Sequence, residues 1–209
     1  MTARLLGTWP DRSEQWLAAR RGRIGGSDIG AVMGWSPYQT RDGLMAEKLG
    51  LAEPKPTSKA MERGIFLEDG VRRWLCAHEQ VELDPERSNG TWVDADDDRI
   101  AYNADGVTTC GKLIEIKVPE YRDEEHGWGR AGTKSDKIPL HYKTQVMWGM
   151  GLFGLDECLV GVLSGQPRFE FARYRLRFEP DIYQYLREQA GIFLDELATH
   201  QATQKETAA

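Results

Sequence analysis

Two acidic residues and a lysine stand close together in the stretch NADGVTTCGKLIEIKVP, residues 103 to 119. Because side chains alternate along a strand, Glu115 and Lys117 share one face of the apolar segment KLIEIKV, and Ile114 and Ile116 share the other. The segment GVTTCGK predicts a hairpin that brings Asp105 beside Glu115. Adjoining carboxylates repel each other unless a cation joins them, and such oxygen ligands select hard ions such as Mg²⁺ or Mn²⁺. A lysine in the same space can orient a metal-bound water and offset charge on a phosphate. An isolated E-x-K triplet, by contrast, is more often a Glu–Lys surface pair.

Two further polar residues lie on predicted helices. Glu68, in RGIFLED, would supply another carboxylate to a metal site, or would simply be a solvated helix position. Gln145, in HYKTQVMWGM, can hydrogen-bond DNA or hold the lysine, or would be an exposed polar residue.

Near the N-terminus, Trp16, Arg20 and Ser27 form the pattern W-x3-R-x6-S, with IGGSDIGAVMGWSPY around the serine. A helix N-terminus with a hydroxyl group and an arginine is suited to binding phosphate. The alternative is that Ser27 caps the helix that follows it and Arg20 is an ordinary surface residue.

The elements that would position these residues alternate in type along the chain. Hydrophobic periodicity and capping residues predict helices over residues 12–21 (with Ser13 as N-cap), after Ser27, up to Gly50, and over 59–79. A hairpin over 91–109 and the strand of Glu115 follow, then a polar loop over 120–138, a helix over 140–154, strands over 157–165 and 168–179, and a closing helix over 179–200. This order predicts one α/β domain over residues 1–200 with a central mixed β-sheet flanked by helices, and a disordered tail over 201–209.

Composition excludes several classes of protein. The chain has 209 residues and a net charge of −6, with a local excess of +2 over residues 1–50. Binding to nucleic acid would therefore use a local groove and bound cations. The three cysteines, Cys76, Cys110 and Cys158, are too scattered for a disulfide framework, a zinc site or an iron–sulfur cluster, which favours a reducing, cytoplasmic setting. No apolar run is long enough to span a membrane, and we expect no membrane partner.

The string D-G-x8-E-x-K, although Ala104 replaces the usual proline before it, resembles the signature of the PD-(D/E)XK nucleases. Together with RGRIGGSDIGAVMGWSPY, RGIFLE and the glutamine helix, it resembles the lambda-exonuclease-like family, also called YqaJ-like viral recombinases. The resemblance runs from about Trp16 to Cys158. It implies the PD-(D/E)XK restriction-endonuclease-like core.

The resemblance also implies roles for the residues. Asp105 and Glu115 would bind two Mg²⁺ ions (Mn²⁺ being possible), with the backbone carbonyl of Ile116 as a further ligand and Glu68 as the helix carboxylate near the metals. Lys117 would be the catalytic lysine. The pocket for the 5′-phosphate of the digested strand would comprise Arg20, Ser27 and Gln145.

The function implied is a Mg²⁺-dependent exonuclease that digests linear double-stranded DNA from 5′-phosphorylated ends in the 5′ to 3′ direction and leaves 3′ overhangs for phage recombination. Family members form ring-shaped homotrimers and often work with a single-strand annealing protein. The alternatives are an endonuclease or Cas4-like nuclease, and a non-catalytic DNA-binding recombination scaffold.

Overall fold

The computed structural model describes residues 3–10, 13–52, 58–132 and 136–208. Helices and strands follow one another in the order β1 (Ala3–Gly7), α1 (Glu14–Arg20), α2 (Gly26–Val32), α3 (Arg41–Lys48), α4 (Lys59–Glu79), β2 (Thr91–Asp94), β3 (Ala101–Asn103), β4 (Gly106–Val107), β5 (Leu113–Lys117), α5 (Leu140–Phe153), β6 (Glu157–Ser164), β7 (Glu170–Arg177) and α6 (Pro180–Ala208). The prediction of helix over 59–79 is confirmed, with Ser58 as N-cap and a left-handed Gln80 after the last turn.

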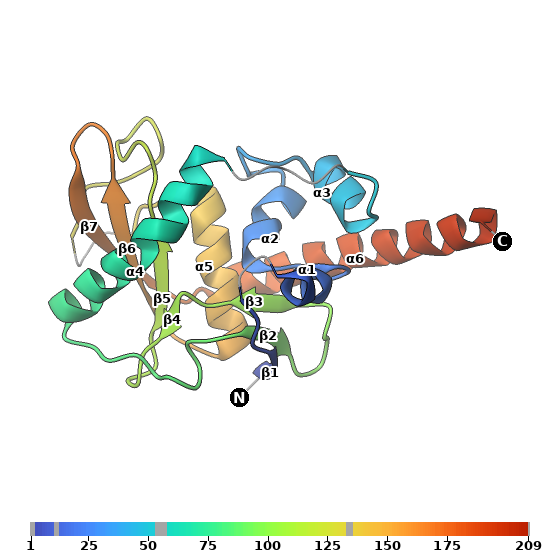
Figure 1. Ribbon diagram of the computed structural model, residues 1–209, viewed down its shortest axis with the longest axis horizontal. Coiled ribbons are helices and arrows are strands. Elements are labelled where there is room, and N and C mark those ends of the chain that lie inside the picture. The colour runs from blue at the N-terminus through green and yellow to red at the C-terminus, as the bar shows by residue number, and fades with distance from the viewer. Residues whose placement is uncertain (1–2, 11–12, 53–57, 133–135, 209) are drawn as a thin grey trace.

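The described residues form two β-sheets (Figure 1). The larger has the strand order β4-β5-β6-β7, in which β5 and β6 run parallel and the other pairs run antiparallel. The smaller is antiparallel in the order β1-β2-β3 and contains the predicted hairpin. The α/β class with a mixed sheet flanked by helices is thus confirmed, while strand β1 and the separate three-stranded sheet were not anticipated.

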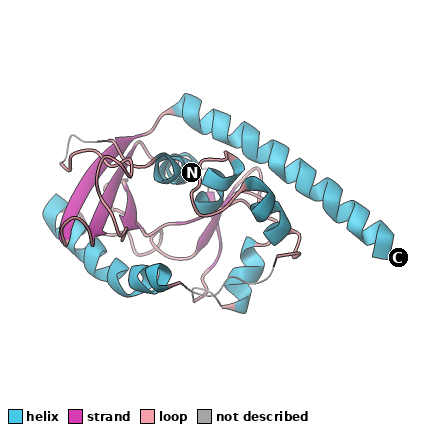
Figure 2. Ribbon diagram, turned by 90° about the horizontal axis from the view of Figure 1, so that it is seen from above, coloured by secondary structure: helices cyan, strands magenta, loops and turns pink. Residues whose placement is uncertain are grey.

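Helix α4 covers one face of the larger sheet, and helix α5 lies on the other (Figures 1 and 2). On the α4 side, Ile114 and Ile116 pack with Val71 and Leu75. On the α5 side, Leu113 belongs to the main hydrophobic core. The predicted alternation along β5 is therefore confirmed, and it directs Glu115 and Lys117 to the α5 side.

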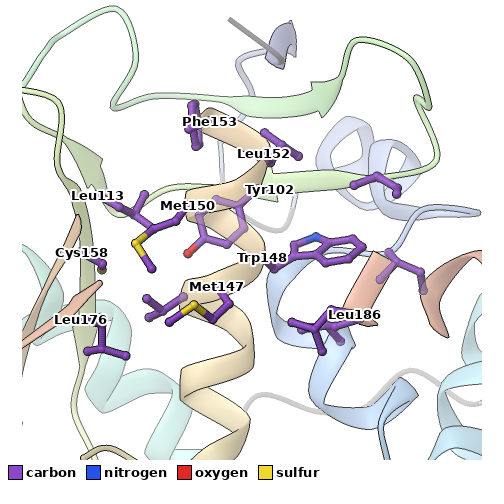
Figure 3. Close-up of a cluster of buried hydrophobic side chains, with 14 of the residues drawn as sticks. Tyr102, Leu113, Met147, Trp148, Met150, Leu152, Phe153, Cys158, Leu176 and Leu186 are labelled. Atoms are coloured by element: carbon purple, nitrogen blue, oxygen red, sulfur yellow. The ribbon is translucent and has the colours of Figure 1, made fainter. Parts of the chain in front are cut away.

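The main core lies between β5, β6, β7 and the helices α2, α5 and α6. Figure 3 shows the α5 side chains Met147, Trp148 and Met150 directed into it from different sides of the helix. Helix α5 is buried on nearly every side, and the smaller sheet, α2 and α6 all pack against it.

Helix α6 packs on this core through residues up to Leu197, and its final turns extend away from the body (Figure 2). Residues 201–208 are helical, so the expectation of a disordered tail is wrong for them. The sequence QATQKETA contains no Gly or Pro and several strong helix formers, which lets the packed helix continue into solvent. Across the described ranges, no helix has the length and apolar character needed to cross a membrane.

Candidate active site

Glu115 is the centre of a buried polar cluster on the α5 side of β5. Its side chain is 1% exposed, and both of its oxygens are hydrogen-bonded. The Tyr102 hydroxyl donates to Oε2 at 2.6 Å, and Gln145 Nε2 donates to Oε1 at 2.6 Å. The Lys117 ammonium group also pairs with Oε1. A carboxylate this deep in the protein is stable only because it is so fully paired.

Asp105 adjoins this carboxylate, as the hairpin prediction required. It directly precedes β4, which pairs antiparallel with β5. Its Oδ2 accepts a hydrogen bond from the backbone N–H of Ile116 at 2.6 Å. Burial and then the negative charges of Glu115 and Glu68 raise the pKa of Asp105 well above its usual value. Without a bound cation the Asp105 carboxyl group therefore favours its neutral form, because Lys117 alone does not offset burial and two neighbouring carboxylates.

Lys117 follows Glu115 on the same strand face. Its Nζ lies 3.2 Å from Gln145 Oε1 and 5.0 Å from the centre of the Tyr142 ring. Burial alone would lower the pKa of Lys117, but the charges of Glu115 and Asp105 outweigh it and raise the pKa. Lys117 is consequently a cation in this arrangement. Asp105, Glu115, Lys117 and Gln145 are called the Glu115 cluster below.

Glu68 and Arg72 border the cluster on helix α4. The Glu68 side chain is 40% exposed, and its Oε1 lies 3.7 Å from Arg72 Nη1. Arg72 Nη1 also donates to the backbone carbonyl of Asp105 at 3.1 Å, which ties α4 to the hairpin. The structure thus places Glu68 where its charge acts on Asp105. Arg72 was missed from the sequence, although its i,i+4 spacing from Glu68 was a usable signal.

Arg20 and Ser27 meet at a second polar cluster, between α1 and α2. Arg20 Nη2 donates to Ser27 Oγ at 3.1 Å and to Asp28 Oδ1 at 3.3 Å. Lys48 Nζ donates to Asp28 Oδ2 at 2.9 Å, with the Lys48 side chain only 3% exposed. Arg20, Ser27, Asp28 and Lys48 are called the Asp28 cluster below.

Asp28 controls the geometry of that cluster. Its Oδ2 accepts the N–H of Gly25, which is the N-cap of α2. The expectation that Ser27 caps α2 is therefore wrong: Ser27 lies within the helix, and its hydroxyl group accepts a hydrogen bond from Arg20. Burial favours a raised pKa for Asp28, but the charges of Lys48 and Arg20 outweigh burial and lower the pKa. Asp28 and Lys48 were missed because neither belongs to a recognisable pattern.

The two clusters adjoin through helices α2 and α5. A Cβ atom added at Gly26 would lie 3.1 Å from Gln145 Cγ. Gln145 itself contacts Glu115 and Lys117, so the structure groups it with the proposed catalytic residues. Of its two predicted uses, holding the lysine is the one whose contacts are present.

Tyr102 is the fourth residue that sequence reasoning missed. Its side chain is 1% exposed, and burial together with the Glu115 charge raises its pKa well above the usual value, so the hydroxyl group remains a donor. An alternating aromatic residue in a hairpin gives no signal of such a contact.

The donor set suits a hard divalent cation. Asp105 and Glu115 provide adjoining carboxyl oxygens, the ligands that Mg²⁺ and Mn²⁺ prefer, and a divalent cation would offset the burial and repulsion that raise the pKa of Asp105. For Ile116, the structure shows the N–H bound to Asp105, and its carbonyl remains a predicted ligand. Within the described ranges, no group of three or more His, Cys, Asp or Glu side chains is already gathered in a metal-binding arrangement. Glu68 thus influences Asp105 by charge without completing a three-carboxylate set.

The D-G-x8-E-x-K string runs from the residue before β4 to the end of β5, in a mixed sheet flanked by α4 and α5, and this arrangement belongs to the fold class of the PD-(D/E)XK core. The solved structures that this chain resembles agree on the fold. An alkaline exonuclease from Laribacter hongkongensis has a TM-score of 0.71 at 20% identity, covering 94% of this chain and 98% of that one. A phage-related exonuclease from Haemophilus somnus has a TM-score of 0.57 at 11% identity, covering 85% and 96%.

Sequence comparison gives the family. The profile of the YqaJ-like viral recombinase domain matches residues 15–156. The chain belongs to this family, and its fold is that of the lambda-exonuclease-like alkaline exonucleases. The uncharacterized protein YqaJ of Bacillus subtilis is 24% identical over an alignment of 164 residues that covers 75% of this chain. The match spans 48% of the length of that relative.

Proposed function

We propose that the protein is a Mg²⁺-dependent exonuclease that digests linear double-stranded DNA. It starts at 5′-phosphorylated ends, proceeds 5′ to 3′ and leaves 3′ single-stranded overhangs for phage recombination. The observation that carries the proposal is the convergence of Asp105, Glu115 and Lys117 next to the Arg20–Ser27 pair. Membership of the YqaJ-like family and the exonuclease fold support it.

The acidic residues have the role of cation ligands in this proposal. Asp105, Glu115 and the carbonyl of Ile116 would hold two Mg²⁺ ions, with Mn²⁺ as a substitute and Glu68 at the edge of the site. Bound there, the ions would supply an activated water for phosphodiester hydrolysis and stabilise charge on the phosphate and the leaving oxygen.

The remaining residues bind and orient the DNA. Lys117, held by Gln145, offers its ammonium group to the negative charge of the scissile phosphate. Arg20 and Ser27 bind the terminal 5′-phosphate, since a guanidinium and a hydroxyl group are strong donors to phosphate oxygens. The Laribacter exonuclease is known in complex with dAMP, the kind of mononucleotide that stepwise digestion releases.

The proposal extends to assembly and setting. A ring-shaped homotrimer that encloses duplex DNA suits a chain with net charge −6, because enclosure retains the substrate without a strongly basic surface. The protein would act in the cytoplasm of a bacterial host and cooperate with a single-strand annealing protein. Light scattering of the purified protein measures the assembly directly, and a monomer would contradict the ring.

Linear duplex labelled on either strand tests the reaction itself. With Mg²⁺, we expect the strand labelled at its 5′ end to release the label as a mononucleotide at once, while EDTA stops the reaction. Covalently closed circular DNA should survive. Loss of the circle would indicate an endonuclease, and binding of the duplex without any cleavage would indicate a scaffold.

A further inference from the structure

Tyr102 contacts three of the elements that carry proposed site residues, namely α2, α5 and β5. It lies on β3, and its hydroxyl group donates to Glu115 Oε2 on β5 at 2.6 Å. Its ring lies against helix α5, with the oxygen directed toward the strand that carries Leu113 (Figure 3). The Phe153 ring meets it edge to face, with centroids 6.2 Å apart.

The space for this ring exists because two neighbouring residues lack side chains. A Cβ atom at Gly26 on α2 would lie 2.4 Å from Tyr102 Cε2. A Cβ atom at Gly149 on α5 would lie 2.5 Å from Tyr102 Cζ. Both distances are too short for non-bonded carbons, so each helix approaches the ring through a glycine. The Tyr102 ring therefore packs tightly between α2, which carries Ser27, and α5, which carries Gln145.

The two oxygens of Glu115 consequently have separate partners. Oε2 is bound by Tyr102, whereas Oε1 faces Lys117 and Gln145. A carboxylate with one oxygen fixed in this way cannot rotate to present its oxygens interchangeably. Loss of a group that orients a metal ligand through a hydrogen bond typically weakens metal binding or activity by about 10- to 100-fold.

We propose that Tyr102 is a positioning residue that holds the Glu115 carboxylate in its cation-binding orientation, and that Gly26 and Gly149 are required because they admit its ring. This inference rests on the proposed function, because it assigns Glu115 to a divalent cation.

The main test compares cation affinity in Tyr102→Phe and the wild type, without DNA. The probe is Mn²⁺, whose free concentration is read from its paramagnetic resonance signal. We expect Tyr102→Phe to bind Mn²⁺ about tenfold more weakly. The Mg²⁺ concentration needed for half-maximal digestion should rise in parallel, while KM for the duplex stays unchanged. The matched control is Tyr174→Phe, another buried tyrosine, whose hydroxyl group donates to the backbone carbonyl of Gly129 at 2.9 Å. Its Mn²⁺ affinity should equal that of the wild type.

A second pair of variants changes the packing of helix α5 against a tyrosine ring and removes no polar group. Gly149→Ala crowds Tyr102, and Gly151→Ala, two residues along the same helix, instead crowds Tyr183, with an added Cβ 2.3 Å from Cε2 of that ring. Only Gly149→Ala should weaken Mn²⁺ binding. This pair decides the question if Tyr102→Phe does not fold.

The outcomes separate the two proposals. Wild-type protein that binds no Mn²⁺ would refute the proposed function and this inference with it. Wild-type binding that persists undiminished in Tyr102→Phe and in Gly149→Ala would overturn the role of Tyr102 alone. Equal losses in the experimental and control variants would also overturn it, because general loosening of the core would then be the cause.

Discussion

The Asp28 cluster and the Glu115 cluster are built from the same kinds of side chain, yet their charges are balanced differently. In the first, one carboxylate lies between the cations of Lys48 and Arg20 and accepts a backbone N–H, and its pKa is lowered. In the second, Asp105 and Glu115 share a single lysine, and the pKa of Asp105 is raised. The first cluster holds two cations for one carboxylate, whereas the second holds one lysine for two carboxyl groups.

The two clusters therefore differ in which kind of charge is in excess. Buried ions that satisfy one another fix a loop and a helix terminus, and here they hold Arg20 beside Ser27. A buried excess of one charge is unfavourable by itself and favours binding of a counter-ion. The comparison therefore assigns the positioning of Arg20 and Ser27 to Asp28 and Lys48, and cation binding to the Glu115 cluster, and each assignment can be tested by removing one charge.

Removing the charge of Asp105 should have the largest effect. Asp105→Asn keeps an oxygen for the Ile116 N–H but loses a cation ligand, so we expect the digestion rate to fall by about a thousandfold or more. Stability in EDTA should not fall, because the variant relieves repulsion with Glu115. Initial rates on labelled duplex and thermal unfolding measure the two effects. Asp96→Asn, at an exposed turn between β2 and β3, serves as control. Wild-type digestion by Asp105→Asn would remove Asp105 from the site.

Removing the charge of Asp28 should instead lower the free energy of unfolding. Asp28→Asn leaves the Lys48 ammonium group buried without its carboxylate, and we expect unfolding in urea to be easier by about 3 to 5 kcal/mol. The double variant Asp28→Asn/Lys48→Met should recover most of that loss, since an apolar side chain needs no partner. A double variant as unstable as the single one would show that the ion pair is not the cause.

Arg20 should affect the choice of DNA end. Arg20→Ala removes a charged donor from the proposed phosphate pocket, so kcat/KM on 5′-phosphorylated duplex should fall about tenfold. The control is the same duplex with 5′-hydroxyl ends. On this substrate, kcat/KM of Arg20→Ala should be nearly equal to that of the wild-type protein. Equal losses on both ends would refute a specific role in phosphate recognition.

The pH dependence of stability should differ in sign between the clusters, with slopes of at most about 1.4 kcal/mol per pH unit for one proton. The lowered pKa of Asp28 gives stability that is present above the ordinary pKa of aspartate and is lost as the pH falls through the lower folded-state value. The raised pKa of Asp105 does the opposite: stability declines as the pH rises from the ordinary value through the raised one.

Urea midpoints in EDTA between about pH 3 and pH 8 measure both slopes. Asp28→Asn should flatten the acid limb, and Asp105→Asn should remove the decline on the other side. Superimposable pH profiles for the two variants would mean that the clusters do not differ in charge balance.

The sequence by itself determined the local elements and part of the site. Helix α4 begins and ends where its periodicity predicts, and β5 presents Glu115 and Lys117 on the face opposite Ile114 and Ile116. The short hairpin also made Asp105 adjoin Glu115. These features were predictable because periodicity, capping and tight turns depend on residues that are near one another in the chain.

Only the tertiary structure decided which distant side chains share a buried space. In the folded protein, Lys48 donates a hydrogen bond to Asp28, and Lys117 donates one to Gln145. Tyr102 packs between Gly26 and Gly149, which lie on two different helices. Gly25 is the N-cap of α2, so the Ser27 hydroxyl group is available to accept a hydrogen bond from Arg20. Helix α6 continues through residues 201–208. The physical reason is that close packing fixes the distance and angle between elements, and no pattern along a single segment contains that information.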